Sequence, residues 1–221
     1  MKIRWQSEIF FWAVIAGMFL LAALSWSAAP DSIPIHWNIQ GQADNYAGKA
    51  VGLLLLPCTA LGIYLMFLVI PRIDPSRADY GAFGKAFGVK RLSTLVVLAV
   101  CEAVLLLWIR GIHVSVGTVM PLAIGGLFMI IGNYMGKIRP NWFVGIRTPW
   151  TLMSRHVWAK THRMGGWVFI ASGALIILTA IFFNTWAWWV LLATGAGGSV
   201  WAFVYSYLVW RTAPDWPERA K

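Results

Sequence analysis

The chain has few charged residues, very few acids and almost no cysteine. Only 12% of its 221 residues are charged and 8 are Asp or Glu, whereas soluble domains carry about 25% charged residues. Hydrophobic residues make up 59% of the chain. This balance excludes an ordinary soluble domain and predicts an integral membrane protein. The two cysteines, Cys58 and Cys101, both lie inside long apolar runs, so we expect them to be small packing residues rather than a disulfide.

Motifs of nucleophilic, metal-dependent and nucleotide chemistry are also missing. The sequence contains no GxSxG, no HExxH, no Walker-type glycine loop and no paired carboxylates. We therefore predict no catalytic residues and no cofactor. One enzyme class stays open as an alternative, a membrane enzyme acting on lipid or cell-wall precursors, whose basic loop would hold a phosphate.

Long apolar runs are what the sequence has instead. A helix needs about 20 residues to cross a hydrocarbon core of about 30 Å, and six runs approach or exceed that length, at about 8–29, 51–70, 92–109, 116–136, 165–183 and 187–209. Backbone polar groups cannot stay unpaired in lipid, and these runs are far longer than the strands of an outer-membrane barrel. The predicted fold class is therefore all-α, a polytopic protein with six transmembrane helices.

The basic residues indicate how the chain crosses the membrane. All but two of the 18 Lys and Arg fall at the termini or in the segments 71–91 and 137–164; the exceptions are Lys49 and Arg110. Because cytoplasmic loops carry an excess of Lys and Arg, both termini and these two segments are predicted to be cytoplasmic. Topology thus accounts for the net charge of +10, and we expect contact with membrane lipids and no direct binding of nucleic acid.

This topology divides the chain into three parts. They are residues 1–70, the first two transmembrane helices with an external loop at 30–50; residues 71–91, a cytoplasmic loop; and residues 92–221, a four-helix portion with a cytoplasmic loop at 137–164 and a short cytoplasmic tail. The external loop contains two prolines and few aliphatic residues, so we expect turns there. Pro71 and Pro75 are expected to stop the second helix.

Glu102 is the one acid that this reading places inside a span. The surrounding Leu, Ile and Val residues favour insertion by more than the roughly 3 kcal/mol that a central charge costs. An acid within the membrane is by default a functional hypothesis, here a proton or ligand site with Thr59 at a similar depth as partner. It supports an alternative function, a small proton-coupled transporter. A protonated Glu102 hydrogen-bonded within the bundle is the structural explanation.

Polar residues of the external loop supply weak metal-ligand candidates. His36, Asp31 and Asp44 are suitable ligand types, but one histidine without HxH or HExxH spacing does not identify a site. We predict no metal. The segment IPIHWN is expected instead to place Trp37 at the membrane interface.

The cytoplasmic segment from Lys137 to Arg163 holds six basic residues and no acid. Thr151 or Ser154 could cap a short helix running to about Met164, and its basic and apolar faces predict an amphipathic helix lying in the interface. Nearby glycines also predict close helix contacts. They are the GxxxG pair Gly132 and Gly136, and Gly195, Gly197 and Gly198 in the last run.

Two stretches resemble a known family. IGNYMGKIRPNWFVGIRTPWTLMSRHVWAKTHRMGGWVFIASG, from Ile131 to Gly173, resembles the signature of the SdpI family, immunity proteins against a sporulation-delaying killing peptide. IPIHWNIQGQADNYAGK resembles the short domain of unknown function that often precedes it. The resemblance marks as ligand or signalling candidates the motif positions Asn133, Gly136, Pro140, Asn141, Gly145, Arg147, Thr148, Pro149, Trp150 and Trp158, and in the external loop Pro34, His36, Trp37, Gly41 and Lys49.

The resemblance implies a multi-pass protein of the bacterial plasma membrane. Such a protein would protect its cell against a secreted, membrane-active peptide toxin. In the best-known member the protein also acts as a receptor that holds a cytoplasmic repressor at the membrane, so a peptide toxin and a repressor protein are the partners that the resemblance implies.

Overall fold

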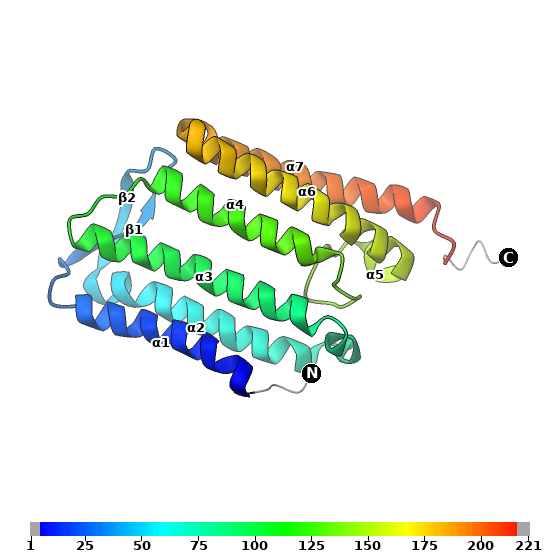
Figure 1. The fold of residues 1–221 in the computed structure, drawn as a ribbon, viewed down its shortest axis with the longest axis horizontal. Helices are drawn as coiled ribbons and strands as arrows, with labels where there is room; N and C mark the ends of the chain where they lie inside the picture. The colour runs from blue at the N-terminus through cyan, green and yellow to red at the C-terminus, as the bar shows by residue number, and fades with distance from the viewer. Residues whose placement is uncertain (1–4, 216–221) are drawn as a thin grey trace.

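The computed structural model describes residues 5–215, in which six long helices run side by side (Figure 1). Each is long and apolar enough to cross a membrane. In chain order they are α1 (Trp5–Ser25), α2 (Lys49–Ile73), α3 (Gly84–Ile109), α4 (Val116–Met135), α6 (Arg155–Phe182) and α7 (Asn184–Arg211). The predicted all-α, six-span membrane fold is confirmed. Four basic residues used in the charge argument, Lys2, Arg4, Arg219 and Lys221, lie outside the described residues.

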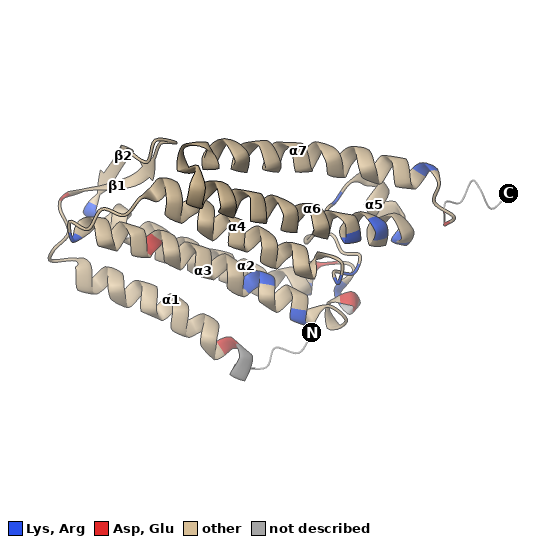
Figure 2. Ribbon diagram, turned by 45° about the horizontal axis from the view of Figure 1, so that its top comes forward, with Lys and Arg blue, Asp and Glu red and all other residues tan. Residues whose placement is uncertain are grey.

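The bundle has two different ends. Its hairpin end carries the antiparallel strands β1 (Ser32–Trp37) and β2 (Ala43–Gly48) and the α3–α4 link. Its basic end carries the 3-10 turn η1 (Arg77–Gly81), the short helix α5 (Pro149–Met153) and the motif loop, residues 136–148. Figure 2 shows most Lys and Arg at the basic end. This segregation is what the sequence led us to expect; the side of the membrane on which each end lies stays a prediction.

The hairpin corrects the expectation of turns in residues 30–50. Residues Ser32–Trp37 pair with Ala43–Gly48 as antiparallel strands, and Ile33 is fully buried. Ile33 reaches α2 because Gly52 has no side chain: a Cβ on Gly52 would lie 2.6 Å from the Ile33 Cβ. Gly41, with φ of +76°, turns the chain between the strands. The strands therefore form a fixed cover on the helix ends.

The predicted loop 71–91 is much shorter than expected. Helix α2 continues through Pro71 to Ile73, and α3 begins at Gly84. A proline in the last turn removes only one backbone hydrogen bond, and the Arg72 guanidinium donates to the Leu68 carbonyl one turn back. Arg91, counted as a loop residue, lies inside α3 and is buried.

The expected interfacial helix is also wrong. Ser154 does cap a helix, by accepting a hydrogen bond from the Val157 N–H at 3.0 Å, but that helix is α6, which continues unbroken to Phe182. Its first turns are held by packing, since Val157 is buried in a cluster with Val209 and Ala213. Packing against other parts of the protein, rather than against lipid headgroups, therefore determines the structure of this region.

Helices α4 and α6 are in direct backbone contact through glycines. A Cβ on Gly132 would lie 2.6 Å from the Gly166 carbonyl oxygen, and a Cβ on Gly173 would lie 2.5 Å from that of Gly125. This confirms the predicted close contact at Gly132. The glycines of the last span do not behave this way: additions at Gly195 and Gly197 would meet nothing within 4 Å, so α7 leaves open space there.

Candidate functional site

Asn141 holds the motif loop in shape from within. Its side chain is 2% exposed. The amide Nδ2 donates to the carbonyls of Arg139 and Val144 at 2.8 and 2.9 Å, and Oδ1 accepts from the N–H groups of Phe143 and Val144 at 3.0 and 2.6 Å. The side chain spends its full hydrogen-bonding capacity on the loop itself. Asn141 therefore positions the loop.

A buried histidine fixes the next part of the loop. The Ile146 N–H donates to His162 Nε2 at 3.0 Å, so the ring proton lies on Nδ1, which faces the Trp158 carbonyl at 2.9 Å. Gly145 passes directly over this ring with φ of +117°, and a Cβ there would lie 2.3 Å from Nε2. The Trp158 ring stacks on His162 at 4.0 Å. His162 was missed from sequence because its partner is a backbone group 16 residues away.

Asp74 ties the motif loop to the end of α2. The carboxylate is 1% exposed and accepts from the Tyr80 hydroxyl at 2.8 Å and from the Trp142 N–H at 3.1 Å. Burial raises the pKa of the Tyr80 phenol, and its hydrogen bond to Asp74 raises that pKa further. Sequence reasoning did not select Asp74, since nothing local distinguishes it from a solvated loop acid.

The RTPW motif builds helix α5 and docks it on α7. Thr148 caps α5 in a reciprocal box with Thr151, with Pro149 as the first helical residue. The Thr148 hydroxyl also donates to Ser206 Oγ on α7 at 2.9 Å. Trp150 packs against two α7 rings, at 4.8 and 5.1 Å between centroids. These motif residues have direct structural roles.

Arg147 is different, because its side chain is exposed. One guanidinium nitrogen, Nη1, donates to the Trp142 carbonyl at 2.9 Å, and the other guanidinium N–H groups have no hydrogen-bond partner among the described residues. Asn133 is also exposed, on α4, while Gly136 ends that helix and Pro140 is half-buried. The predicted motif positions thus gather at the basic end, with Arg147 as the available cation.

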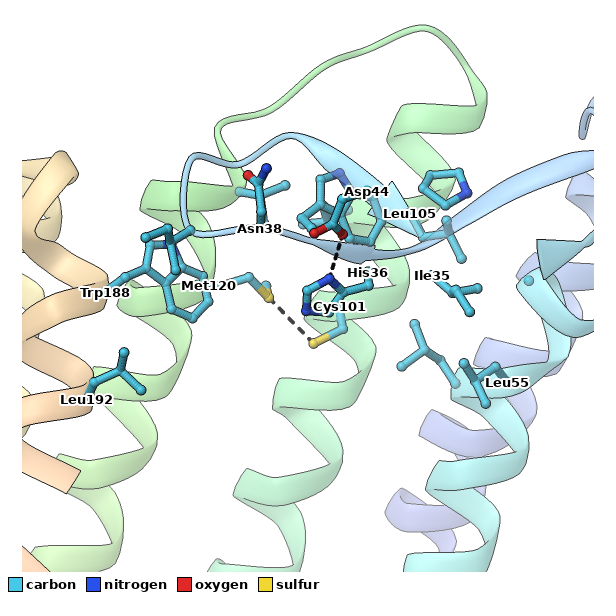
Figure 3. Close-up of a pocket in the computed structure, with 17 residues that line it drawn as sticks. Ile35, His36, Asn38, Asp44, Leu55, Cys101, Leu105, Met120, Trp188 and Leu192 are labelled. Carbon is cyan, nitrogen blue, oxygen red and sulfur yellow. Dashed lines mark hydrogen bonds and ion pairs between the residues drawn. The ribbon is translucent and has the colours of Figure 1, made fainter. Parts of the chain in front are cut away.

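A pocket of about 650 Å³ lies at the hairpin end, roofed by the hairpin and walled by α2, α3, α4 and α7 (Figure 3). Its wall is mostly apolar, with Leu55, Leu105, Met120 and Leu192 among the lining residues. Such a concave, largely apolar space with few polar groups is the usual form of a ligand site.

The polar part of this pocket is a pair on the two strands. His36 Nδ1 lies 2.6 Å from Asp44 Oδ1, and both side chains line the pocket (Figure 3). Within residues 5–215 no group of three or more His, Cys, Asp or Glu comes together, so Asp31 does not complete a ligand set with this pair.

The other external candidates are divided between the pocket and its surroundings. Pro34 and Trp37 line the pocket beside His36. Gly41 lies in the turn between the strands, and Lys49 begins α2 with its Nζ 6.0 Å from the Trp26 ring.

Glu102 is separate from both sites. It is 2% exposed, and its Oε1 has no hydrogen-bond partner among the described residues. The expected partnership with Thr59 is wrong: the Thr59 hydroxyl is exposed and donates to the Leu55 carbonyl of its own helix at 2.6 Å.

A second buried acid, Glu8, corrects the view that Glu102 is alone. Glu8 lies in α1 and is 3% exposed. It accepts from the guanidinium of Arg91 on α3 at 2.5 and 3.2 Å, and from the Tyr64 hydroxyl on α2 at 2.9 Å. The Phe11 ring lies 4.3 Å from the Arg91 guanidinium carbon. This group joins the first three helices.

Comparisons with known proteins match both segments singled out above. Residues 137–206 match the model of the SdpI/YfhL protein family. The SdpI-family resemblance is confirmed. Residues 13–61, which include β1, β2 and the start of α2, match the domain of unknown function DUF1648.

A curated relative extends the SdpI match along most of the chain. The Immunity protein SdpI of Bacillus subtilis (strain 168) is 25% identical over 169 residues, which are 76% of this chain and 79% of that protein. No solved structure matches the chain. The SdpI match covers most of the motif loop, α5, α6 and most of α7, so it includes the motif residues at the basic end, whereas the strands of the hairpin lie in the DUF1648 match.

Proposed function

We propose that this multi-pass protein gives a bacterial cell immunity against a secreted, membrane-active peptide toxin, and that the hairpin-end pocket receives the peptide at the outer face of the plasma membrane. The observation that carries the proposal is the pocket itself, combined with similarity to a protein named for immunity. The pocket offers a ligand both an apolar wall and the His36–Asp44 pair.

The dimensions of the pocket suit part of a peptide. A volume of about 650 Å³ lies within the roughly 300–1,000 Å³ of typical ligand sites, which is room for a few apolar side chains. The His36 imidazole and the Asp44 carboxylate would present hydrogen-bonding groups to the peptide's polar groups. A membrane-active peptide is amphipathic, so it matches this combination of surfaces.

Capture at one end would be communicated to the other through the α4–α6 pair. Helix α4 contributes Val116 and Met120 to the pocket, and its opposite end continues into the motif loop. Its glycine contacts with α6 leave little freedom for separate movement. A ligand with unequal affinity for two bundle arrangements would shift the motif loop, and that loop is the surface we propose for a cytoplasmic repressor.

The test is survival of cells challenged with purified membrane-active peptides. Cells that express the wild-type chain should survive concentrations that kill cells without it. Met120→Trp, which fills the pocket, should reduce protection at least tenfold in lethal concentration, and His36→Ala should reduce it less. Tyr46→Ala is the matched control, because Tyr46 lies on the same hairpin, is 48% exposed and is outside the pocket lining.

Two results would contradict this proposal, the first its function and the second its site. Wild-type cells that die at the same peptide concentrations as empty cells would exclude immunity to those peptides. Full protection by Met120→Trp, with the protein present in the membrane at normal level, would exclude the hairpin-end pocket as the site. Repressor binding is tested separately, by crosslinking from the motif loop with and without peptide.

A second function, proton-coupled transport, is supported by one observation, the unpartnered Oε1 of buried Glu102. An acid kept without a partner in the bundle could exchange a proton during a transport cycle. Transport requires turnover, whereas immunity by capture does not. Substrate flux in vesicles that depends on pH and is abolished by Glu102→Gln would support the carrier; flux unchanged in that variant would exclude it.

A further inference from the structure

A second cavity lies within the span region, between α4, α6 and α7. Its volume is about 500 Å³. Phe128 and Phe169, stacked at 5.0 Å, line it from α4 and α6. Helix α7 lines the cavity with Gly195 and Gly198. At its lower end, the end nearer the basic end of the bundle, the cavity is lined by Arg147 and Thr148 of the motif loop. We call this space the α7 groove.

The glycines of α7 keep the groove open. Between α4 and α6 glycines mark backbone contact, but a Cβ on Gly195 would meet nothing within 4 Å, and one on Gly198 only the Val168 Cγ1 at 4.0 Å. The hydroxyls in this wall are satisfied within α7, since Thr194 donates to the Val190 carbonyl and Ser199 to that of Gly195, at 2.7 and 2.8 Å. These two α7 hydroxyls therefore need no hydrogen bond from an occupant.

The lower end of the groove is cationic. Arg147 uses Nη1 on the Trp142 carbonyl, and its other guanidinium N–H groups have no hydrogen-bond partner among the described residues. Thr148 is committed to Ser206 and Thr151. No Asp or Glu is among the residues that line the groove, so nothing there neutralises the guanidinium.

We propose that the α7 groove holds one acyl chain of an anionic phospholipid, with the lipid phosphate bound by Arg147. The groove has the same order of polarity as the lipid, apolar toward the middle of α6 and α7 and cationic at the basic end. A guanidinium binds phosphate through parallel charge-assisted hydrogen bonds. The occupant would fill a space inside the membrane that no described side chain fills, and the proposal is independent of any toxin.

Native mass spectrometry of the purified full chain in detergent tests this. Phosphatidylglycerol should bind at least tenfold more tightly than phosphatidylcholine, because the net charge distinguishes these two headgroups. Arg147→Ala should bring phosphatidylglycerol binding down to the phosphatidylcholine level. Gly198→Leu fills the apolar part and should weaken both lipids. Inorganic phosphate at equal concentration should not displace the lipid.

Matched controls separate the site from general effects. Arg155→Ala removes another exposed cation of the basic end, and Gly62→Leu adds the same side chain to an exposed glycine of α2; neither lines the groove, and both should bind as the wild type does. Circular dichroism and gel filtration establish folding. If Arg147→Ala does not fold, Gly198→Leu and Arg147→Gln decide.

Several results would overturn the proposal. Wild-type binding of both lipids with equal affinity, or full binding by a folded Arg147→Ala, would exclude the phosphate contact. Displacement by inorganic phosphate alone would indicate a simple anion site. A wild-type dimer that Gly198→Leu converts to a monomer, without change in lipid binding, would assign the groove to a contact between two copies.

Discussion

Gly145 is the residue at which the motif loop has least freedom. Its φ of +117° is rarely adopted by residues with side chains, and the His162 ring occupies the place where a Cβ would stand. These two constraints are independent, because the first concerns the backbone and the second the packing. Gly145 is therefore needed for loop geometry, whatever the loop binds.

Gly145→Ala should destabilise the protein by at least about 2 kcal/mol. The substitution combines backbone strain of about 1–3 kcal/mol with loss of the Ile146–His162 hydrogen bond, worth about 1 kcal/mol. Unfolding in mixed micelles, followed by tryptophan fluorescence, measures the change. Gly88→Ala is the control: its added Cβ meets nothing within 4 Å in α3, so helix propensity should leave it neutral or slightly more stable. Equal stability of the two variants would contradict this account.

Asp215 holds the last described turn of chain against the start of α6. It accepts from the Ser154 hydroxyl at 2.7 Å and from the His156 N–H at 3.1 Å. Partial burial by itself would raise the pKa of the Asp215 carboxyl. The hydrogen bonds outweigh this effect and lower that pKa below its usual 3.8. Its carboxylate also lies favourably at a helix N-terminus.

The contribution of Asp215 to stability should depend on pH. A carboxyl whose pKa is lower in the folded state stabilises that state above the unfolded pKa, and this stabilisation is lost as pH falls through the folded pKa. We expect wild type to exceed Asp215→Asn in stability at pH 6, with the difference shrinking as pH falls below about 3.8 and vanishing only below the lowered pKa of the folded state. Thermal unfolding at several pH values measures it. A difference that persists unchanged at pH 2 would be inconsistent with a charged contact.

Among the elements, α1, α2 and α3 are joined by one polar group inside an apolar bundle. Glu8 lies on α1, Tyr64 on α2 and Arg91 on α3, and both Tyr64 and Arg91 donate hydrogen bonds to the Glu8 carboxylate. A buried ion pair costs desolvation of both charges, but removal of a single partner leaves the other charge buried and unpaired. The pair thus fixes how α1 docks.

Removing either partner alone should cost more than removing both. Glu8→Met and Arg91→Met should each lose about 3–5 kcal/mol of stability, and the double variant should lose less than either single one. The same micelle unfolding assay gives the double-mutant cycle. Arg77→Met, an exposed change on η1, should have little effect. Additive losses in the cycle would show that the two residues do not interact.

The existence of the helices was predictable, while some of their boundaries were not. Hydropathy identified six spans because each apolar run is by itself long enough to cross the hydrocarbon core as a helix. The start of α3 was missed since Arg91 looks like a loop cation, and its neutraliser, Glu8, is 83 residues away. The hairpin had a local signal, the alternation of SIPIHW, which the prolines obscured.

At the level of the whole molecule, the two ends differ in charge and in content. The hairpin end has an apolar pocket with one His–Asp pair, and the basic end has the cations and the motif loop. The motif's location at the basic end follows from charge and hydropathy. The pocket could not be predicted, because it is assembled from the hairpin and four helices.

Orientation in the membrane can be tested directly. In a chain with Cys58 and Cys101 replaced by Ser, a cysteine at Tyr46 on the hairpin should react with a membrane-impermeant maleimide added to intact cells. A cysteine at Lys137 on the motif loop should react only after the cells are opened, because basic segments stay in the cytoplasm. Both positions are exposed. The reverse labelling pattern would overturn the predicted topology.

The Glu8–Arg91 pair also bears on how the protein is made. The 83 residues between the partners take roughly 4–17 s to synthesise at about 5–20 residues per second. During that interval the Glu8 carboxylate lacks its Arg91 partner, and burying an unpaired carboxylate in the bundle is unfavourable. Final docking of the first helix therefore waits until the start of the third has left the ribosome, and it requires the earliest helix to stay near the site of insertion until then.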